Sequence, residues 1–317
     1  MADDVTSNGA GAVRQTALQA LERLAVEMRP QLHRYCARMT GSVIDGEDVL
    51  QEALLKAFEA APRTEPLDNP EGWLFRIAHN AALDFLRRRA RENAAHSDED
   101  LDMAVDPASG AEDRQIVAAS LRTFMRLPVA QRSTVVLMDV LGYSLDEIAS
   151  IVNLSVAAIK AALHRGRARL RELAQEPEDL PLPILAEPQR ALLTAYIDRF
   201  NARDFDTVRD MLAEEVRLEL VSRLRARGRG DVGNYFTRYA QREDWLFVLG
   251  LVDRRPAVLV RDPANPGAQP SYFVLLEWAG NRLMNIRDFR FARYAIEGAE
   301  LVVLDEAEAN PTSRGSN

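Results

Sequence analysis

Cationic side chains gather in two segments of the chain, and their chemistry suits the binding of phosphate. Between residues 71 and 91 five arginines stand against two acids, and between 120 and 174 eight basic residues oppose four acids. Locally clustered Lys and Arg neutralise nucleic-acid phosphates even in a chain whose net charge is −8. Solvated helix faces carry similar clusters, so charge alone leaves both interpretations open.

The second cationic segment has the pattern of two helices joined by a tight turn. Ser144 and Glu147 have the spacing of a capping box. Asn153 suits a left-handed turn residue, and Ile159 and Leu163 would face inward on the second helix. This pattern favours a DNA-binding helix-turn-helix, and the alternative is a helical hairpin with a solvated basic face. The candidate DNA contacts are Ser155, Lys160, His164, Arg165, Arg167 and Arg169.

These side chains lie on predicted helices, whose bounds follow from the periodicity of the apolar residues. The spacing of large apolar residues predicts helices over 16–39, 46–60 and 70–91, and helices resume from 111 to about 173. Eight acids and no Lys or Arg lie between residues 92 and 113. This acidic composition, with few large apolar residues, predicts a flexible linker.

The pattern changes after a second linker, which is rich in proline. Helices are predicted at 188–201 and 205–212, and a basic loop at 223–230. Segments with strand character are 216–221, 245–251, 257–260, 271–278 and 283–291. The sequence therefore predicts several domains, with two all-α modules followed by one α+β module. Residues 1–15 and 303–317 are predicted to be disordered tails.

Composition argues against several classes of protein. We expect no membrane span, because the sequence has no run of about 18 apolar residues. The acidic N-terminus has no apolar segment of a signal peptide, so we expect a cytoplasmic protein. A single cysteine, Cys36, excludes an internal disulfide, and the four histidines lack a metal-ligand spacing. We therefore expect no metal and no cofactor.

Residues 127–172 (LPVAQRSTVVLMDVLGYSLDEIASIVNLSVAAIKAALHRGRARLRE) resemble region 4 of bacterial sigma factors of the extracytoplasmic function (ECF) type. In that family the module recognises the promoter −35 element. The family usually has Gly-Thr and Ser-Arg near the start of the recognition helix, where this chain has Ala157-Ala158 and Ala161-Ala162. Because alanine cannot hydrogen-bond to bases, Lys160, His164 and Arg165 would make more of the contact.

Two further motifs resemble region 2 of the same family. Residues 45–58 resemble the helix that docks on the clamp helices of the β′ subunit of RNA polymerase, although the segment alone is an ordinary amphipathic helix. By this resemblance the core-binding candidates are Asp48, Gln51, Glu52 and Lys56. Residues 69–89 resemble the segment that reads and melts the −10 element. The corresponding candidates are Arg76, Asn80, Asp84, Arg87, Arg88 and Arg89.

The pattern of residues 196–289 resembles SnoaL-like domains, which are cone-shaped α+β folds with a pocket. Enzymes of this fold use acid and base groups inside the cone, often Asp with His. No histidine follows His164, which excludes a mechanism that uses a histidine of this module. The candidate pocket residues are Asp288, Glu219, Glu277 and Arg287, and each could equally be an exposed strand residue.

The resemblance implies an ECF sigma factor whose SnoaL-like domain modulates it. Its partners would be core RNA polymerase (β′ clamp helices and β flap) and promoter DNA, with a small-molecule ligand of the C-terminal domain left open. The expected domains are region 2 (17–91), an acidic linker (92–111), region 4 (112–174), a Pro-rich linker (175–188), the SnoaL-like domain (189–302) and a tail (303–317). One alternative is a one-component helix-turn-helix regulator that senses a ligand. Another is an enzyme, and we do not expect enzymatic activity.

Overall fold

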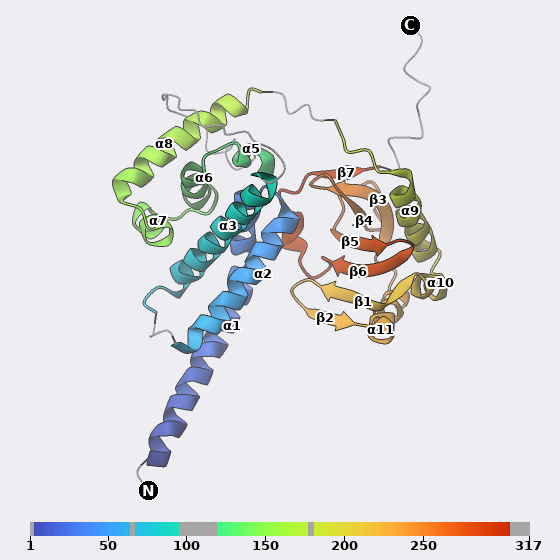
Figure 1. Cartoon of the computed structure of the whole chain (residues 1–317), viewed down its shortest axis with the longest axis horizontal. Coiled ribbons are helices and arrows are strands. Elements are labelled where there is room, and N and C mark those ends of the chain that lie inside the picture. The colour runs from blue at the N-terminus through green and yellow to red at the C-terminus, as the bar shows by residue number, and fades with distance from the viewer. Residues whose placement is uncertain (1–2, 64–66, 95–118, 177–180, 305–317) are drawn as a thin grey trace. The chain divides into compact units, whose positions relative to one another are not determined.

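The computed structural model describes residues 3–63, 67–94, 119–176 and 181–304. The chain divides into two compact units, residues 1–178 and residues 179–317 (Figure 1). Most of the predicted acidic linker at 92–111, and the tail after residue 304, lie outside the described residues. Within them, the predicted fold class is confirmed, because helical segments precede a unit built on a mixed sheet.

Three long helices begin the first unit. They are α1 (Asp3–Thr40), α2 (Val43–Ala60) and α3 (Pro70–Ala94), with a short 3-10 turn η1 (Ala61–Arg63) after α2. The prediction of a disordered tail at 1–15 was wrong, since α1 begins at Asp3. Extending an existing helix costs much less than nucleating one, so residues of modest propensity can continue it.

A tight turn joins α1 to α2 and brings the two helices together. Gly41 has φ of +79°, the left-handed conformation that favours glycine at a helix end. The side chain of Ser42 then accepts hydrogen bonds from the N–H groups of Ile44 and Asp45. A Cβ at Gly46 would lie 2.6 Å from the backbone of Ala37, so this glycine permits the close approach of the helices.

Shorter helices complete the unit. They are α5 (Leu121–Met125), α6 (Val129–Val135), a π-helical turn η2 (Val136–Val140), α7 (Leu145–Val152) and α8 (Val156–Leu173). Ser144 and Glu147 form the predicted capping box at the start of α7. Asn153 has φ of +56°, as predicted for the turn before α8. Among the described residues no single helix is long and apolar enough for a membrane span, and only the pair α7 and α8, bent by 99°, passes that test together.

The helices before residue 95 and those after residue 118 share one hydrophobic core. Phe75 of α3 packs edge-on against Tyr143, which lies just before α7, with ring centroids 5.0 Å apart. The guanidinium of Arg132 in α6 donates a hydrogen bond of 2.6 Å to the carbonyl oxygen of Met39 in α1. The same guanidinium donates to the carbonyl oxygens of Met125 at 3.1 Å and Leu127 at 3.0 Å. Buried Arg132 thus joins the first helix to the second helical segment.

The second unit is an α+β domain. Its helices are α9 (Glu187–Asn201), α10 (Phe205–Asp210) and α11 (Arg229–Ala240), with a 3-10 turn η3 (Arg293–Ile296). Its strands are β1 (Leu212–Leu220), β2 (Leu224–Arg227), β3 (Leu246–Val252), β4 (Arg255–Arg261), β5 (Tyr272–Ala279), β6 (Arg282–Asp288) and β7 (Leu301–Val303). They form one sheet in the order β2-β1-β6-β5-β4-β3-β7, in which only β1 and β6 pair in parallel.

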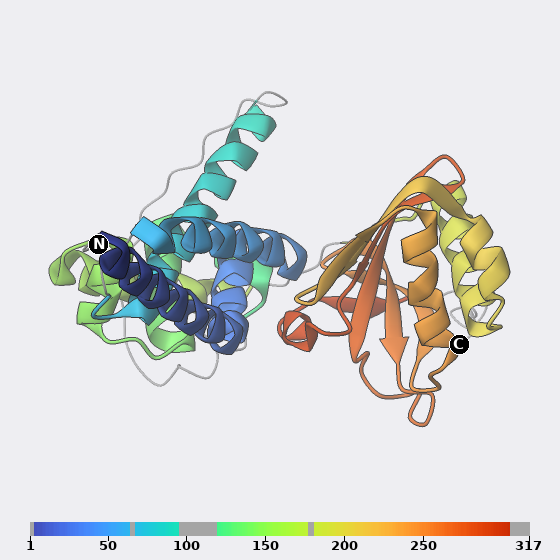
Figure 2. The same ribbon diagram turned by 90° about the horizontal axis from the view of Figure 1, so that it is seen from below.

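Two strands and one α-helix of this domain were not predicted from the sequence. Part of the predicted basic loop at 223–230 is strand β2, which pairs with β1, and helix α11 follows it. Strand β7 includes Val303, so the predicted start of the tail at residue 303 was wrong. Helices α9, α10 and α11 gather on one face of the sheet (Figure 2). Phe200 of α9 is central to that core and stacks on Phe247 of β3, with centroids 4.1 Å apart.

Candidate nucleic-acid and polymerase interface

The helix-turn-helix places four of its predicted DNA contacts on the surface. Ser155 is exposed just before α8, and Lys160, His164 and Arg165 are exposed along it. Ser155 has a structural role as well, since its hydroxyl oxygen accepts a hydrogen bond from the N–H of Ala158 at 3.2 Å and caps α8. The exposed basic residues are therefore available to a partner, while Ser155 fixes the start of the helix that carries them.

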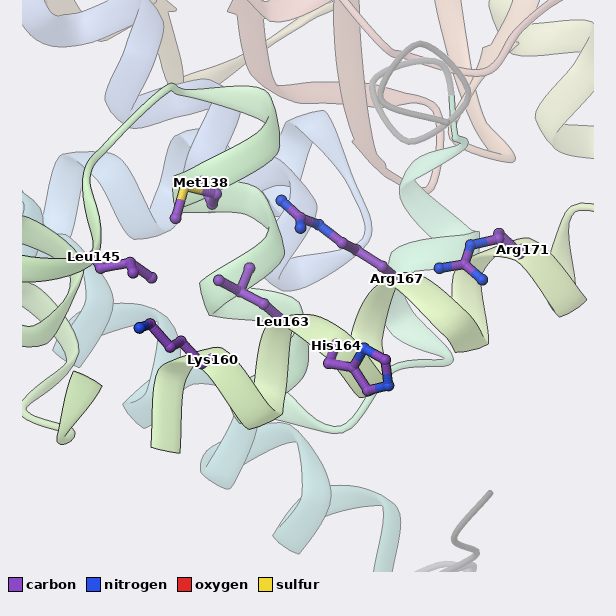
Figure 3. A pocket seen from close by; sticks show the side chains of 7 residues that line it. All are labelled: Met138, Leu145, Lys160, Leu163, His164, Arg167 and Arg171. Carbon is purple, nitrogen blue, oxygen red and sulfur yellow. The ribbon is translucent and has the colours of Figure 1, made fainter. Parts of the chain in front are cut away.

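One stripe of α8 carries basic side chains around a shallow hollow. Figure 3 shows Lys160, His164, Arg167 and Arg171 projecting from the helix around it. The hollow has a volume of about 330 Å³, and Met138, Leu145 and Leu163 complete its wall. Residues 160, 164, 167 and 171 recur at helical spacing, so one helix face presents all four. Arg165 does not line this hollow, so the predicted contacts occupy more than one face.

Two of the predicted DNA contacts are held by acids of the same unit. Arg167 forms a two-pronged ion pair with Asp139, whose side chain is 2% exposed. Arg169 pairs with Glu172 at 2.8 Å. A buried carboxylate requires its cation, so Arg167 helps to hold η2 against α8 in addition to any contact with DNA.

The predicted −10 contacts on α3 fall into two groups. Arg76 and Asn80 are exposed. The others take part in ion pairs: Arg87 lies 3.0 Å from Asp84, Arg88 lies 2.8 Å from Glu52, and Arg89 lies 3.0 Å from the largely buried Asp45. Arg88 and Arg89 are therefore tied to α2, whereas Arg87 pairs within α3.

The predicted core-binding residues lie on α2 beside that run. Asp48 is exposed, and the amide of Gln51 donates to Glu47 at 3.3 Å. Lys56 contacts Glu52 at 2.8 Å and Asp84 of α3 at 3.6 Å. Burial raises the pKa of the Glu52 carboxyl, but hydrogen bonds from Lys56 and Arg88 outweigh it and hold the pKa below its ordinary value. One network of charges thus joins the core-binding and −10 candidates.

Two buried polar residues beneath this surface, Glu47 and His79, were not predicted from the sequence. Glu47 is fully buried and pairs with Arg29 of α1. His79 lies on the buried face of α3, with its Nδ1 2.7 Å from the hydroxyl oxygen of Tyr35. Burial lowers the pKa of His79 to about 4, and the nearby Arg87 acts in the same direction. The signal for Glu47 was its place on the apolar stripe of residues 43, 50 and 54.

The structure separates the four pocket candidates of the C-terminal unit. Asp288 is fully buried and borders a cavity. Glu219 pairs with Arg287 at 3.0 Å and with Arg225 at 2.9 Å beside the strands, and Glu277 is exposed. Only Asp288 of the four lines the cavity. In the part of the chain that the structure describes, no group of three or more His, Cys, Asp or Glu is placed to hold a metal ion.

Family models match both helical segments. The model of Sigma-70 region 2 matches residues 24–92, and that of Sigma-70 region 4 matches residues 121–170. These matches cover the helices that carry the core-binding, −10 and −35 candidates.

Curated relatives match the same half of the chain. ECF RNA polymerase sigma factor SigM of Mycobacterium tuberculosis is 34% identical over 154 residues, which are 49% of this chain and 76% of that protein. ECF RNA polymerase sigma factor SigE of Mycolicibacterium smegmatis is 32% identical over 164 residues, 50% of this chain and 63% of that protein.

Two solved structures are also similar in part. The ECF sigma factor SigJ of M. tuberculosis matches with 19% identity and a TM-score of 0.33, over 86% of this chain and 98% of that one. An NTF2-like protein of unknown function from Cytophaga hutchinsonii matches with 12% identity and a TM-score of 0.25, over 31% of this chain and 95% of that one.

Proposed function

Because the chain belongs to the extracytoplasmic function sigma factors of RNA polymerase, we propose that it binds core polymerase, recognises promoter DNA and directs the start of transcription. The observation that carries the proposal is the combination of a capped helix-turn-helix with a separate charged surface on α2 and α3. A regulator that only binds an operator has no use for the second surface. The role requires no covalent chemistry, so we propose a protein without enzymatic activity.

In this proposal the exposed face of α2 binds the β′ clamp helices. Asp48 is exposed near the start of the helix, and Glu52 and Lys56 follow at one-turn spacing. Neighbouring charges of both signs suit a partner surface that is itself charged, because such complementarity fixes the register of docking. The β flap would bind the segment that holds the helix-turn-helix.

Promoter DNA would bind two helices. On α8, Lys160, His164 and Arg165 would contact the −35 element, with Arg167 and Arg169 less available because of their ion pairs. On α3, Arg76 and Asn80 would contact the −10 element. Arg87, Arg88 and Arg89 would bind phosphate after leaving their acidic partners.

The test of polymerase binding is a charge reversal on α2. We expect Asp48→Lys to weaken binding of core polymerase at least tenfold and to abolish promoter-dependent transcripts. Glu59→Lys is the matched control, because it makes the same change at an exposed position near the other end of α2. Equal affinity of Asp48→Lys and wild type would contradict the assignment. If neither form binds the polymerase while duplex DNA is still bound, the chain is a helix-turn-helix regulator.

The test of promoter binding uses the salt dependence of affinity. Replacing Lys160 and Arg165 with alanine should make the plot of log K for DNA binding against log salt concentration less steep. The slope should change by about 0.9 for each lost phosphate contact. Arg126→Ala is the control, since it removes an exposed arginine outside α8. An unchanged slope in the double variant would exclude these side chains as phosphate contacts.

The C-terminal unit would modulate this activity. It is a separate compact unit, which supports a role distinct from that of the helices that carry the promoter contacts. Comparing the full chain with a truncation after residue 175 in transcription assays gives the sign of its effect. Identical transcript yields from the two forms would contradict modulation.

A further inference from the structure

The C-terminal unit holds a cavity that the proposed polymerase and promoter contacts do not use. It lies where helix α11 meets the ends of β1 and β6, and its volume is about 470 Å³. Sites that enclose small organic ligands have volumes of about 300–1,000 Å³. Leu220, Tyr235, Tyr239 and Phe291 give the cavity a partly aromatic wall, which suits a flat apolar ligand body.

A buried carboxylate borders the cavity. Asp288 is 0% exposed, and its Oδ2 accepts hydrogen bonds from the hydroxyls of Tyr235 at 2.9 Å and Tyr239 at 2.7 Å. Its Oδ1 accepts the backbone N–H of Arg290 at 2.8 Å. These three donors all belong to the domain itself.

Burial also affects the pKa of the Asp288 carboxyl. It raises the pKa of Asp288, while hydrogen bonds from Tyr239, Arg290 and Tyr235 act in the opposite direction. A group of this kind is costly inside a domain unless its hydrogen bonds are made. Asp288 meets this requirement and thereby holds Tyr235 and Tyr239 at the wall of the cavity.

Four arginines line the same cavity, and two of them are paired. Arg290 donates to the hydroxyl oxygen of Tyr272 at 2.7 Å and pairs with Asp244. Arg242 also approaches Asp244, at 3.5 Å. One carboxylate thus serves two guanidinium groups on this side of the cavity.

The other two arginines make no ion pair among the described residues. Arg223 lies over the ring of Phe291, 4.2 Å from its centroid, and Arg238 projects from α11. Like charges around a concave surface repel one another, and a bound anion removes that repulsion. Guanidinium groups also bind carboxylates through two parallel hydrogen bonds.

We propose that this cavity binds a small aromatic carboxylate, with its acid group at Arg223 and Arg238. Its ring lies against Tyr235, Tyr239 and Phe291, and Asp288 fixes the hydroxyls of the two tyrosines. The inference concerns a second site of the chain and does not depend on polymerase binding.

The first test is calorimetric titration of the full chain with a matched pair of probes. We expect 2-naphthoate to bind with a submillimolar Kd and 2-naphthamide, which has the same ring without the charge, to bind at least tenfold more weakly. Added salt should weaken the naphthoate, since the interaction is ionic. Absence of binding by 2-naphthoate at millimolar concentration, or equal binding of the amide, overturns the proposal.

Two further comparisons locate the site. Arg238→Gln should weaken 2-naphthoate about tenfold, as expected for loss of one charged hydrogen-bond donor. Arg229→Gln is the control at the other end of α11, where that arginine pairs with Asp210 and Glu214. Equal losses in the two variants would indicate nonspecific attraction and overturn the site.

Discussion

Arg132 is expected to stabilise the helical unit through its three carbonyl partners and not through its charge. Its guanidinium is buried and donates to the carbonyl oxygens of Met39, Met125 and Leu127. Replacement by methionine keeps most of the volume and removes every donor. Replacement by lysine keeps the charge and loses the planar fork that reaches several carbonyls at once.

Two opposing effects set the size of the change. Each buried carbonyl left without a donor costs about 1–3 kcal/mol, so three cost roughly 5 kcal/mol. Burial lowers the pKa of Arg132 from 12.5 to about 10, so removing the cation recovers about 3 kcal/mol. The net cost of Arg132→Met is therefore about 2 kcal/mol, which raises local opening about 30-fold. Arg132→Lys keeps the burial cost and should destabilise at least as much.

Hydrogen exchange on the full chain, followed by mass spectrometry, measures this opening. Peptides from the end of α1 and from α6 should exchange about 30-fold faster in Arg132→Met, whereas strands β3 to β5 of the other unit serve as an internal reference. Arg126→Met is the matched control. Its ion pair with Glu176 is exposed at both ends and is worth about 0–1 kcal/mol.

The outcome with lysine discriminates between the two explanations. If Arg132→Lys exchanges like the wild type, charge and not carbonyl satisfaction is what matters, and the reasoning is wrong. Exchange in Arg132→Met as slow as in the wild type would refute it as well, because the three carbonyls would then need no donor.

Two more predictions concern buried groups of the same unit. The pKa of His79 is lowered from 6.5 to about 4 by burial, so the unfolded chain takes up a proton first as the pH falls. Neutral His79 contributes its full stability above pH 6.5, and about 3 kcal/mol of the free energy of unfolding is lost between about pH 6.5 and 4. Urea unfolding at several pH values should show this loss. The loss should be smaller in His79→Gln. Arg167→Ala leaves the buried carboxylate of Asp139 without its cation and should destabilise the unit by about 3–5 kcal/mol. The double variant Asp139→Asn with Arg167→Met should recover most of that stability in thermal unfolding, and a single variant as stable as wild type would contradict the pairing.

Local signals predicted the helix-turn-helix well. Ser144, Glu147 and Asn153 each act on backbone within a few residues, so their types alone predict a cap or a turn. The family matches confirm that the motif belongs to Sigma-70 region 4. The alternation that predicts strands also located most of the sheet.

Features that depend on distant residues were not predictable in this way. Arg132 and Met39 are far apart in the sequence, and nothing in the chain near either residue indicates their contact. The ion pairs between α2 and α3 depend on the packing of two helices, so the sequence alone indicates no link between Glu52 and Arg88. Helix α11 was missed because it follows the Arg- and Gly-rich segment 223–230, whose composition resembles a loop. Tyr235 and Tyr239, which line the cavity, were missed with it.

The ion pair between Glu52 and Arg88 has a thermodynamic consequence for the order of assembly. A polymerase that binds Glu52, and a phosphate that binds Arg88, each displace the same bond. The free energy of breaking the ion pair reduces the affinity of the partner that binds first. The second partner then binds a residue whose ion pair is already broken. In the proposed function, binding of the two partners would therefore be positively cooperative, and by reciprocity each would strengthen the other by the same factor. An exposed ion pair is worth about 1 kcal/mol at most, so this one bond would couple polymerase and DNA by up to about fivefold.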